Sequence, residues 1–199
     1  MKRFVLISLF LMSISGFSQK IENQEGDFKF LKGASKVEVK FDYSNLKLLK
    51  VNFTEEEYIA DRKKQLNGKQ NGVGDNWEAK WRDSRLGMWQ PMFLKLLTSI
   101  ATNKTNIQFV TDDSTSEYVM LVDVLWIYPG WDAFKQKAKV TSRISIFKRS
   151  DMNTLLVTLD AIEAPGDQFF NNFDDGLRVG EGFAKTAKTL EKMIAKEAK

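Results

Sequence analysis

Apolar and polar residues alternate along several short stretches of the chain, and this period of two is typical of β-strands. The stretches with a strand pattern are 37–43, 107–110, 118–128, 138–146 and 155–161. In 37–43 and 138–146 only one face is apolar, so we expect one side of the sheet to be wet. In 118–128 both faces are apolar apart from Asp123, which predicts a central strand.

Apolar residues at spacings of three and four predict helices between the first two strands. Thr54 and Glu57 have the spacing of a capping box, so we expect a helix over 55–67. A longer apolar stripe predicts a helix over 76–102. We expect a kink or a break at Pro91, because proline lacks the backbone N–H that a helix interior needs.

A last amphipathic helix is predicted after Asp174 or Asp175, either of which can cap it. The predicted order is therefore β-α-α-β-β-β-β-α. The last strands follow one another through short turns and should pair antiparallel, whereas the first reaches the second through helices, which permits parallel pairing. We predict an α+β two-layer sandwich, with a mostly antiparallel sheet of four to five strands and three helices on one face.

The first 18 residues have the pattern of a signal peptide. Lys2 and Arg3 precede an apolar run over 4–14, and the small residues Gly16 and Ser18 suit a cleavage site. The alternative is a buried N-terminal helix or strand. The run is shorter than the roughly 20 residues that span a bilayer, and no later stretch is long enough.

Three segments follow from this pattern. Residues 1–18 are the expected signal peptide, 19–34 an N-terminal tether with a short edge strand, and 35–199 a single α+β domain. Without Lys2 and Arg3 the formal net charge falls from +4 to +2, which gives no support to nucleic-acid binding. No cysteine follows the apolar run, so a lipoprotein anchor is excluded. We expect a periplasmic or secreted protein.

The chain contains no histidine and no cysteine. This composition excludes Ser-His-Asp and Cys-His catalysis, zinc sites built on those residues, and disulfides. Carboxylates, lysines and tyrosines remain for acid–base chemistry, and no motif predicts a cofactor or a metal.

One motif resembles a known family. The residues Gly72, Gly74, Asp75, Trp77, Trp81 and Arg85 form a G-x-G-D-x-W-x-x-x-W-x-x-x-R pattern. The pattern resembles that of a family of uncharacterised exported proteins of Bacteroidota. Similar segments are Phe41-Asp42-Tyr43-Ser44-Asn45, Ala164-Pro165-Gly166 and Gly176–Gly182. The resemblance implies export and no particular activity. The element order is also similar to TolB N-terminal-type envelope domains, which implies a role in assembly.

The best candidate for a functional surface is an aromatic patch around the turn at Pro129-Gly130. Trp126, Tyr128, Trp131 and Phe134 surround this turn. Such side chains bind sugars or anchor a protein partner, because they combine a large apolar area with a polar edge. The alternative is that they close the end of the core.

A second part of this surface is predicted from the strand 118–128. If one sheet face is wet, Leu121, Leu125 and Ile127 would form an apolar patch on it, beside Asp123. Asp123 should be costly there unless it is paired, and Arg143 is a candidate partner from the next strand.

Two glycine groups have structural and functional interpretations. Gly72 and Gly74 precede a helix, where free N–H groups bind anions, but Asp75 can occupy that place as a cap. The glycines in Gly176–Gly182 suit either close packing of the last helix on the sheet or a ligand near its start.

These observations predict a non-catalytic envelope module that binds a protein or glycan partner. The alternative is a carboxylate- or metal-dependent hydrolase acting on glycans or phosphoesters. It requires Asp123, Asp160 or Glu163 to meet a second acid in a cleft, within about 10 Å.

Overall fold

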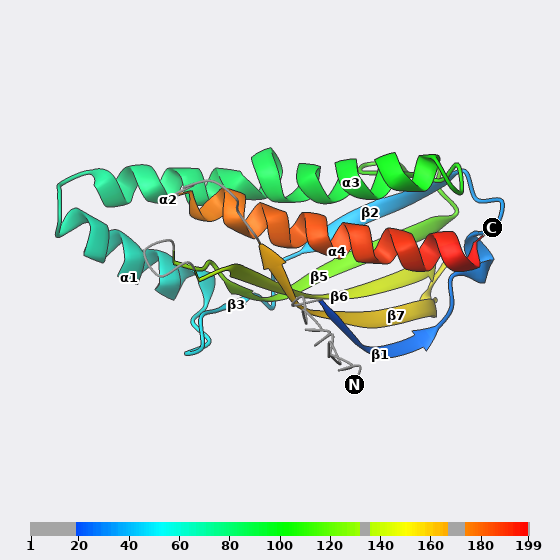
Figure 1. The fold of residues 1–199 in the computed structure, drawn as a ribbon, viewed down its shortest axis with the longest axis horizontal. Helices are drawn as coiled ribbons and strands as arrows, with labels where there is room; N and C mark the ends of the chain where they lie inside the picture. The colour runs from blue at the N-terminus through cyan, green and yellow to red at the C-terminus, as the bar shows by residue number, and fades with distance from the viewer. Residues whose placement is uncertain (1–18, 132–135, 167–173, 199) are drawn as a thin grey trace, which may run out of the picture.

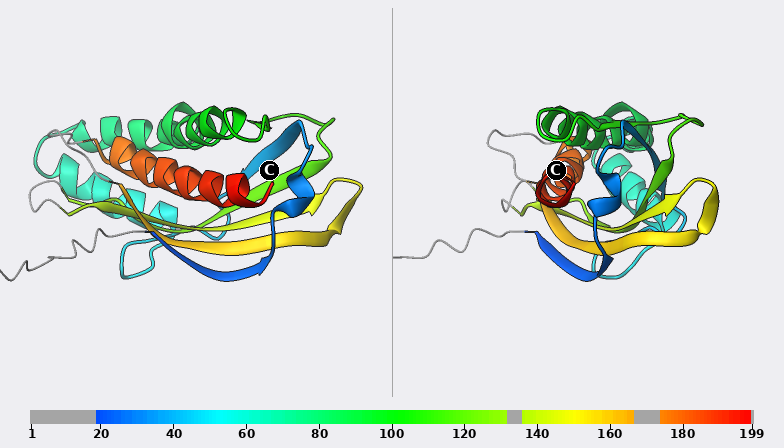
Figure 2. Two further views of the ribbon diagram at one scale, coloured as in Figure 1. Left: turned by 45° about the vertical axis from the view of Figure 1, so that its right-hand side comes forward. Right: turned by 90° about the vertical axis from the view of Figure 1, so that its right-hand side faces the viewer.

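A computed structural model describes residues 19–131, 136–166 and 174–198. The predicted signal peptide over 1–18 and Phe134 lie outside these residues. The described chain is an α+β sandwich of two layers, with all the long helices on one side of a curved sheet (Figures 1 and 2). This arrangement confirms the predicted fold class.

The sheet has seven strands and is mixed. Its strands are β1 (Lys20–Gly26), β2 (Lys36–Asp42), β3 (Lys47–Leu48), β4 (Gln108–Val110), β5 (Tyr118–Tyr128), β6 (Ala138–Lys148) and β7 (Asp151–Gly166). Their order is β1-β7-β6-β5-β2-β4, and β3 also pairs with β5. Strands β1, β7, β6 and β5 pair antiparallel, whereas β2 pairs parallel with both β4 and β5, and β3 parallel with β5.

The prediction of four to five mostly antiparallel strands was therefore too narrow. Strand β2 reaches β4 through the helices, which requires the parallel pairing that the sequence permitted, and it also lies beside β5. Strands β1 and β3 were not predicted as full members of the sheet. One is strongly polar and the other is only two residues long, so neither has an apolar period.

The helical layer consists of α1 (Glu55–Asn67), α2 (Val73–Ser84), the π-helical turn η2 (Arg85–Trp89), α3 (Gln90–Thr102) and α4 (Asp175–Glu197). The helix over 55–67 and its capping box at Thr54 and Glu57 are confirmed. The long helix is interrupted at η2, before Pro91. Pro91 then lies in the first turn of α3, where a missing N–H costs least.

The stretch 19–34 is part of the domain and not a tether. Strand β1 pairs with β7 at the edge of the sheet, and a short 3-10 turn, η1 (Lys29–Leu31), follows it. The side chains of Phe28 and Leu31 are fully buried. The Phe28 N–H donates a 2.8 Å hydrogen bond to Glu197 at the end of α4, which joins the two ends of the described chain.

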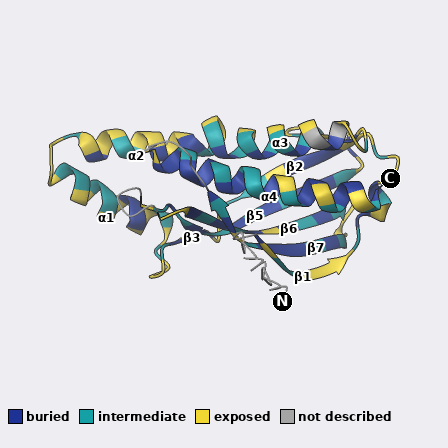
Figure 3. Cartoon of the chain, viewed as in Figure 1, coloured by how far each residue is buried: buried dark blue, intermediate teal, exposed yellow. Residues whose placement is uncertain are grey.

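The core lies between the sheet and the helices, where Figure 3 shows most of the buried residues. It contains Met120, Val122, Val124 and Ile127 of β5. Helix α4 packs closely on β6: a Cβ atom added at Gly182 would lie 2.7 Å from a methyl group of Val140. This close approach favours the packing interpretation of the glycines in α4.

Candidate functional site

Two β-bulges reverse the direction of side chains at one end of the sheet. One bulge is in β5, where Leu125 is an extra residue relative to β6. The other is in the pairing of β6 with β7, where the register shifts between Val140 and Ser142. Thr141 of β6 lies between the two bulges. A bulge changes which face the following residues point to. As a result Trp126, opposite Thr141, lies on the helix-free face, which we call the open face.

The reversal corrects the predicted apolar patch. Ile127 was expected beside Leu121 and Leu125 on the wet face, but it is fully buried under the helices. Leu121 and Leu125 are half-buried. Trp126 and Tyr128 take the place predicted for Ile127, so the aromatic residues and the open face form one surface.

A groove of about 640 Å³ lies on the open face at this end of the sheet. Its lining residues are Lys20, Lys50, Trp126, Tyr128, Gln136, Lys137, Lys139, Ile162, Glu163 and Pro165. They come from β1, β5, β6, β7, the loop after β3 and the segment just before β6. The volume falls within the range of about 300–1,000 Å³ that is typical of small-ligand sites.

Hydrogen bonds at their polar edges hold the two aromatic rings of the groove in place. The Trp126 indole N–H donates to the Leu49 carbonyl oxygen at 2.8 Å, and the Tyr128 hydroxyl pairs with the Gln136 side chain. The ring planes are within 14° of parallel, with centroids 6.4 Å apart. The apolar ring faces are therefore fixed in a common orientation before any ligand binds.

The turn after β5 places the predicted Trp131 outside the groove. Trp131 is 55% exposed and pairs through its backbone with Gln136, but it does not line the groove. Of the predicted aromatic residues that the structure describes, Trp126 and Tyr128 line the groove. Sequence reasoning missed the lysines, and it named Glu163 only as a candidate acid of the hydrolase alternative; the pairing of β1, β6 and β7 brings these residues together.

Glu163 and Lys139 form an ion pair at the groove. The Glu163 residue lies in the β7 bulge with a φ of 47°, and its carboxylate binds the Lys139 ammonium at 2.5 Å. Both side chains are about half exposed, so water and a ligand can compete for either charge.

Asp123 lies on the open face in a row of charged residues. Asp42 of β2 is its neighbour on one side and Arg143 of β6 on the other, as the register shows. The expected Asp123–Arg143 ion pair is replaced: Arg143 donates two hydrogen bonds, at 2.8 and 3.1 Å, to Asp160 of β7. Burial and the Asp42 charge raise the pKa of Asp123, against an opposing hydrogen bond from Asn45.

We expect Asp123→Asn to stabilise the protein at neutral pH, by up to about 1 kcal/mol for a half-exposed charge. The raised pKa means that ionised Asp123 opposes folding. This free-energy cost is absent at pH values below the pKa of Asp123 in the unfolded chain, about 3.9. It is complete at pH values above the raised pKa of Asp123 in the folded protein. The benefit of the substitution should therefore fade as pH falls toward about 4, measured by urea unfolding across the pH range.

Asp160→Asn is the matched control, and its expected effect on stability is opposite to that of Asp123→Asn. Arg143 lowers the pKa of Asp160, so ionised Asp160 supports folding and its loss should destabilise the protein at neutral pH. A destabilising Asp123→Asn substitution at neutral pH would contradict this account of the charged row.

The turn between α1 and α2 uses the glycines Gly72 and Gly74 for structure. Gly72 has a φ of 82°, which favours glycine, and caps α2 in place of the expected Asp75. The Gly74 N–H donates a 2.7 Å hydrogen bond to the Asn67 side chain. Asp75 binds Lys63 and Asn67. These contacts occupy the helix start, so they favour the interpretation as a cap over an anion site.

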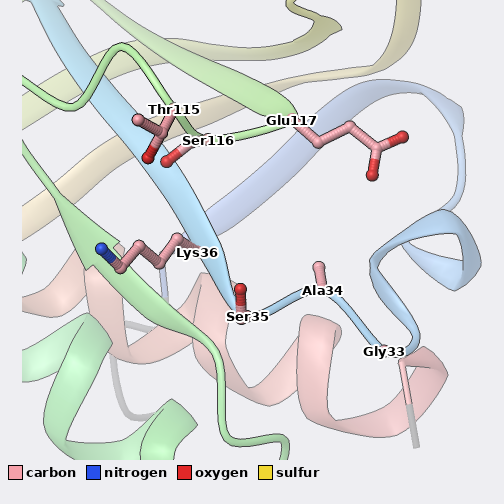
Figure 4. A pocket seen from close by; sticks show the side chains of 7 residues that line it. All are labelled: Gly33, Ala34, Ser35, Lys36, Thr115, Ser116 and Glu117. Atoms are coloured by element: carbon pink, nitrogen blue, oxygen red, sulfur yellow. The ribbon is translucent and has the colours of Figure 1, made fainter.

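A second hollow of about 390 Å³ lies at the other end of β5. Residues 33–36 form one wall and residues 115–117 the other; the Lys36 and Glu117 side chains extend in opposite directions (Figure 4). Lys36 pairs with Asp113 at 3.6 Å and Glu117 with Lys148 at 3.7 Å. No aromatic side chain lines this hollow, so it offers less to a ligand than the groove.

The described residues also bear on metal and membrane sites. Within the described ranges, no three acidic side chains gather in a way that could hold a metal ion. None of the helices described there is both long and apolar enough to cross a membrane.

Comparison with known proteins gives distant structural matches. No protein-family model matches the chain, and no curated protein matches its sequence. The PelC dodecamer from Paraburkholderia phytofirmans is 11% identical, with a TM-score of 0.40, over 87% of this chain and 97% of that chain. A single-residue variant of that dodecamer is 11% identical, with a TM-score of 0.39, over 90% and 94%. Similarity at this level carries no argument about this chain.

Proposed function

We propose that the protein is a non-catalytic envelope module that binds a glycan in the groove on its open face. The observation that carries the proposal is the pair of fixed, nearly parallel rings of Trp126 and Tyr128. The apolar C–H face of a sugar packs on such rings, while its hydroxyl groups reach polar side chains at the rim. Holding the rings in place in advance reduces the entropy lost on binding.

A glycan suits this surface better than a large protein interface. The centres of protein interfaces are depleted in charged residues. Next to the groove, however, the open face carries the charged row of Asp42, Asp123, Arg143 and Asp160. The open face beyond the groove is therefore partly charged, which suits a narrow ligand better than a broad apolar interface.

The proposal places the protein outside the cytoplasm. Its support is the sequence pattern of residues 1–18, which combines two cations, an apolar run and small residues before Gln19. A periplasmic or secreted location would give the groove access to envelope polysaccharides.

The alternative of a carboxylate-dependent hydrolase has no specific observation in its favour. Glu163 is the one acid among the described residues that line the groove, and it binds Lys139. Asp160 is held by Arg143 and Asn23. Asp123 has Asp42 as a neighbour, but neither residue lines a described hollow.

The test is the affinity of the purified protein for immobilised acidic and neutral polysaccharides. We expect Trp126→Ala to weaken binding at least about tenfold, since a central aromatic anchor contributes about 2 kcal/mol or more. Leu86→Ala is the matched control: Leu86 is 75% exposed in the helical layer, far from the groove. Equal binding by wild type and Trp126→Ala would overturn the proposal, as would an equal loss with Leu86→Ala.

A further inference from the structure

The rim of the groove is rich in cations. Four lysines line it: Lys20 from β1, Lys50 from the loop after β3, Lys137 just before β6, and Lys139 in β6. Glu163 is the one acid among the described lining residues, so lysines outnumber acids four to one in the described lining. These lysines come from three separate parts of the chain, so only the fold brings them together.

The ion pairs at this rim leave the cations accessible. Lys139 binds Glu163 and Lys20 binds Glu22, and all four side chains are at least 36% exposed. Exposed pairs of this kind are weak, so a ligand anion can replace the protein carboxylate. No carboxylate of the described residues forms an ion pair with Lys50.

The positive charge is local to the groove. In the middle of the same face Arg143 pairs with the buried Asp160, which leaves the neighbouring carboxylates of Asp42 and Asp123. An anionic ligand that left the groove along the sheet would meet these two carboxylates and be repelled. The charge pattern therefore favours an acidic ligand at the rings and disfavours one elsewhere on the open face.

We propose that the groove takes an acidic glycan, with its sugar rings on Trp126 and Tyr128 and its carboxylates near the lysines. This inference rests on the proposed function and adds the class of ligand. A lysine ammonium binds an anion as a point charge, and therefore supplies affinity for charge without requiring one geometry.

The test compares polygalacturonate with its fully methyl-esterified form, which has the same backbone without the charge. We expect the wild-type protein to bind the acidic polymer more tightly, with the difference shrinking as salt rises. The double variant Lys50→Gln, Lys137→Gln should weaken binding of polygalacturonate by about three- to tenfold, as expected for two exposed ion pairs. Its binding of the esterified polymer should fall by a smaller factor, because that polymer carries no carboxylate.

The matched control is Lys95→Gln, Lys188→Gln, which removes the same charge from exposed positions of α3 and α4. An equal loss in this control would overturn the inference, because the effect would then be one of net charge. A different outcome is that the wild-type protein binds both polymers with equal affinity and loses both on Trp126→Ala. That result would overturn the inference and leave the proposed function intact. If neither polymer binds and the protein captures an envelope protein through Trp126, both proposals are wrong.

Discussion

Trp89→Ala is expected to lower the free energy of unfolding by about 3–5 kcal/mol, the range for truncating a buried tryptophan. Trp89 is the last residue of the π-helical turn η2, and its side chain is fully buried. Its ring stacks on Phe183 of α4 with centroids 5.8 Å apart, and its indole N–H donates a 2.8 Å hydrogen bond to the Gly176 carbonyl oxygen. The substitution therefore leaves a cavity and removes a hydrogen bond between Trp89 and α4.

Urea unfolding followed by circular dichroism measures this loss. Trp131→Ala is the matched control, because Trp131 is exposed on the turn after β5 and should change stability by less than about 0.5 kcal/mol. Similar stability for Trp89→Ala and Trp131→Ala would show that Trp89 does not join the two helices as described.

Arg178→Leu is expected to cost about 3 kcal/mol, because it removes the nearer cation from the buried carboxylate of Asp175 and leaves, among the described residues, only Arg62, at 4.0 Å. The Arg178 guanidinium lies in α4, pairs with Asp175, and donates a 3.0 Å hydrogen bond to the Pro129 carbonyl oxygen. Trp77 also donates to Asp175, at 3.1 Å. Arg178 thus connects α4 to the turn that follows Tyr128.

A double-mutant cycle separates the charge from the loss of packing. Asp175→Asn removes the buried charge, so Arg178→Leu should cost less in that background than in the wild type. Equal costs in the two backgrounds, measured by urea unfolding, would contradict the buried ion pair as the source of the effect.

Local signals allowed most helices to be predicted from the sequence. The capping box at Thr54 and Glu57 fixes the start of α1, and the apolar stripe of α4 follows its cap at Asp174. The parallel pairing of β2 with β4 could also be anticipated, because the helices that join them are long. These features depend on residues that are close in sequence.

Features that depend on partner strands could not be predicted. Strand β1 reads as polar because it is an edge strand, where charged residues prevent further pairing. The bulge at Leu125 exists only in the register between β5 and β6. Without the bulge, an uninterrupted alternation places Trp126 on the core face with Val124, and Ile127 on the wet face.

The candidate site also combines features that nearby residues determine with features that depend on partner strands. The aromatic residues around the turn were recognised from their positions in the sequence, since Trp126 and Tyr128 lie two positions apart just before Pro129. The lysines of the rim were not, because Lys20 and Lys50 are distant in sequence and meet only when β1 and β3 join the sheet.

The most direct test of the central claim is an NMR titration of the indole N–H resonances of the five tryptophans with an oligosaccharide of the polymer that binds. If the ligand occupies the groove on the open face, the Trp126 resonance should shift, while those of Trp77, Trp81 and Trp89 in the helical layer stay in place. A shift confined to the helical-layer tryptophans, with Trp126 unchanged on saturation, would contradict the account.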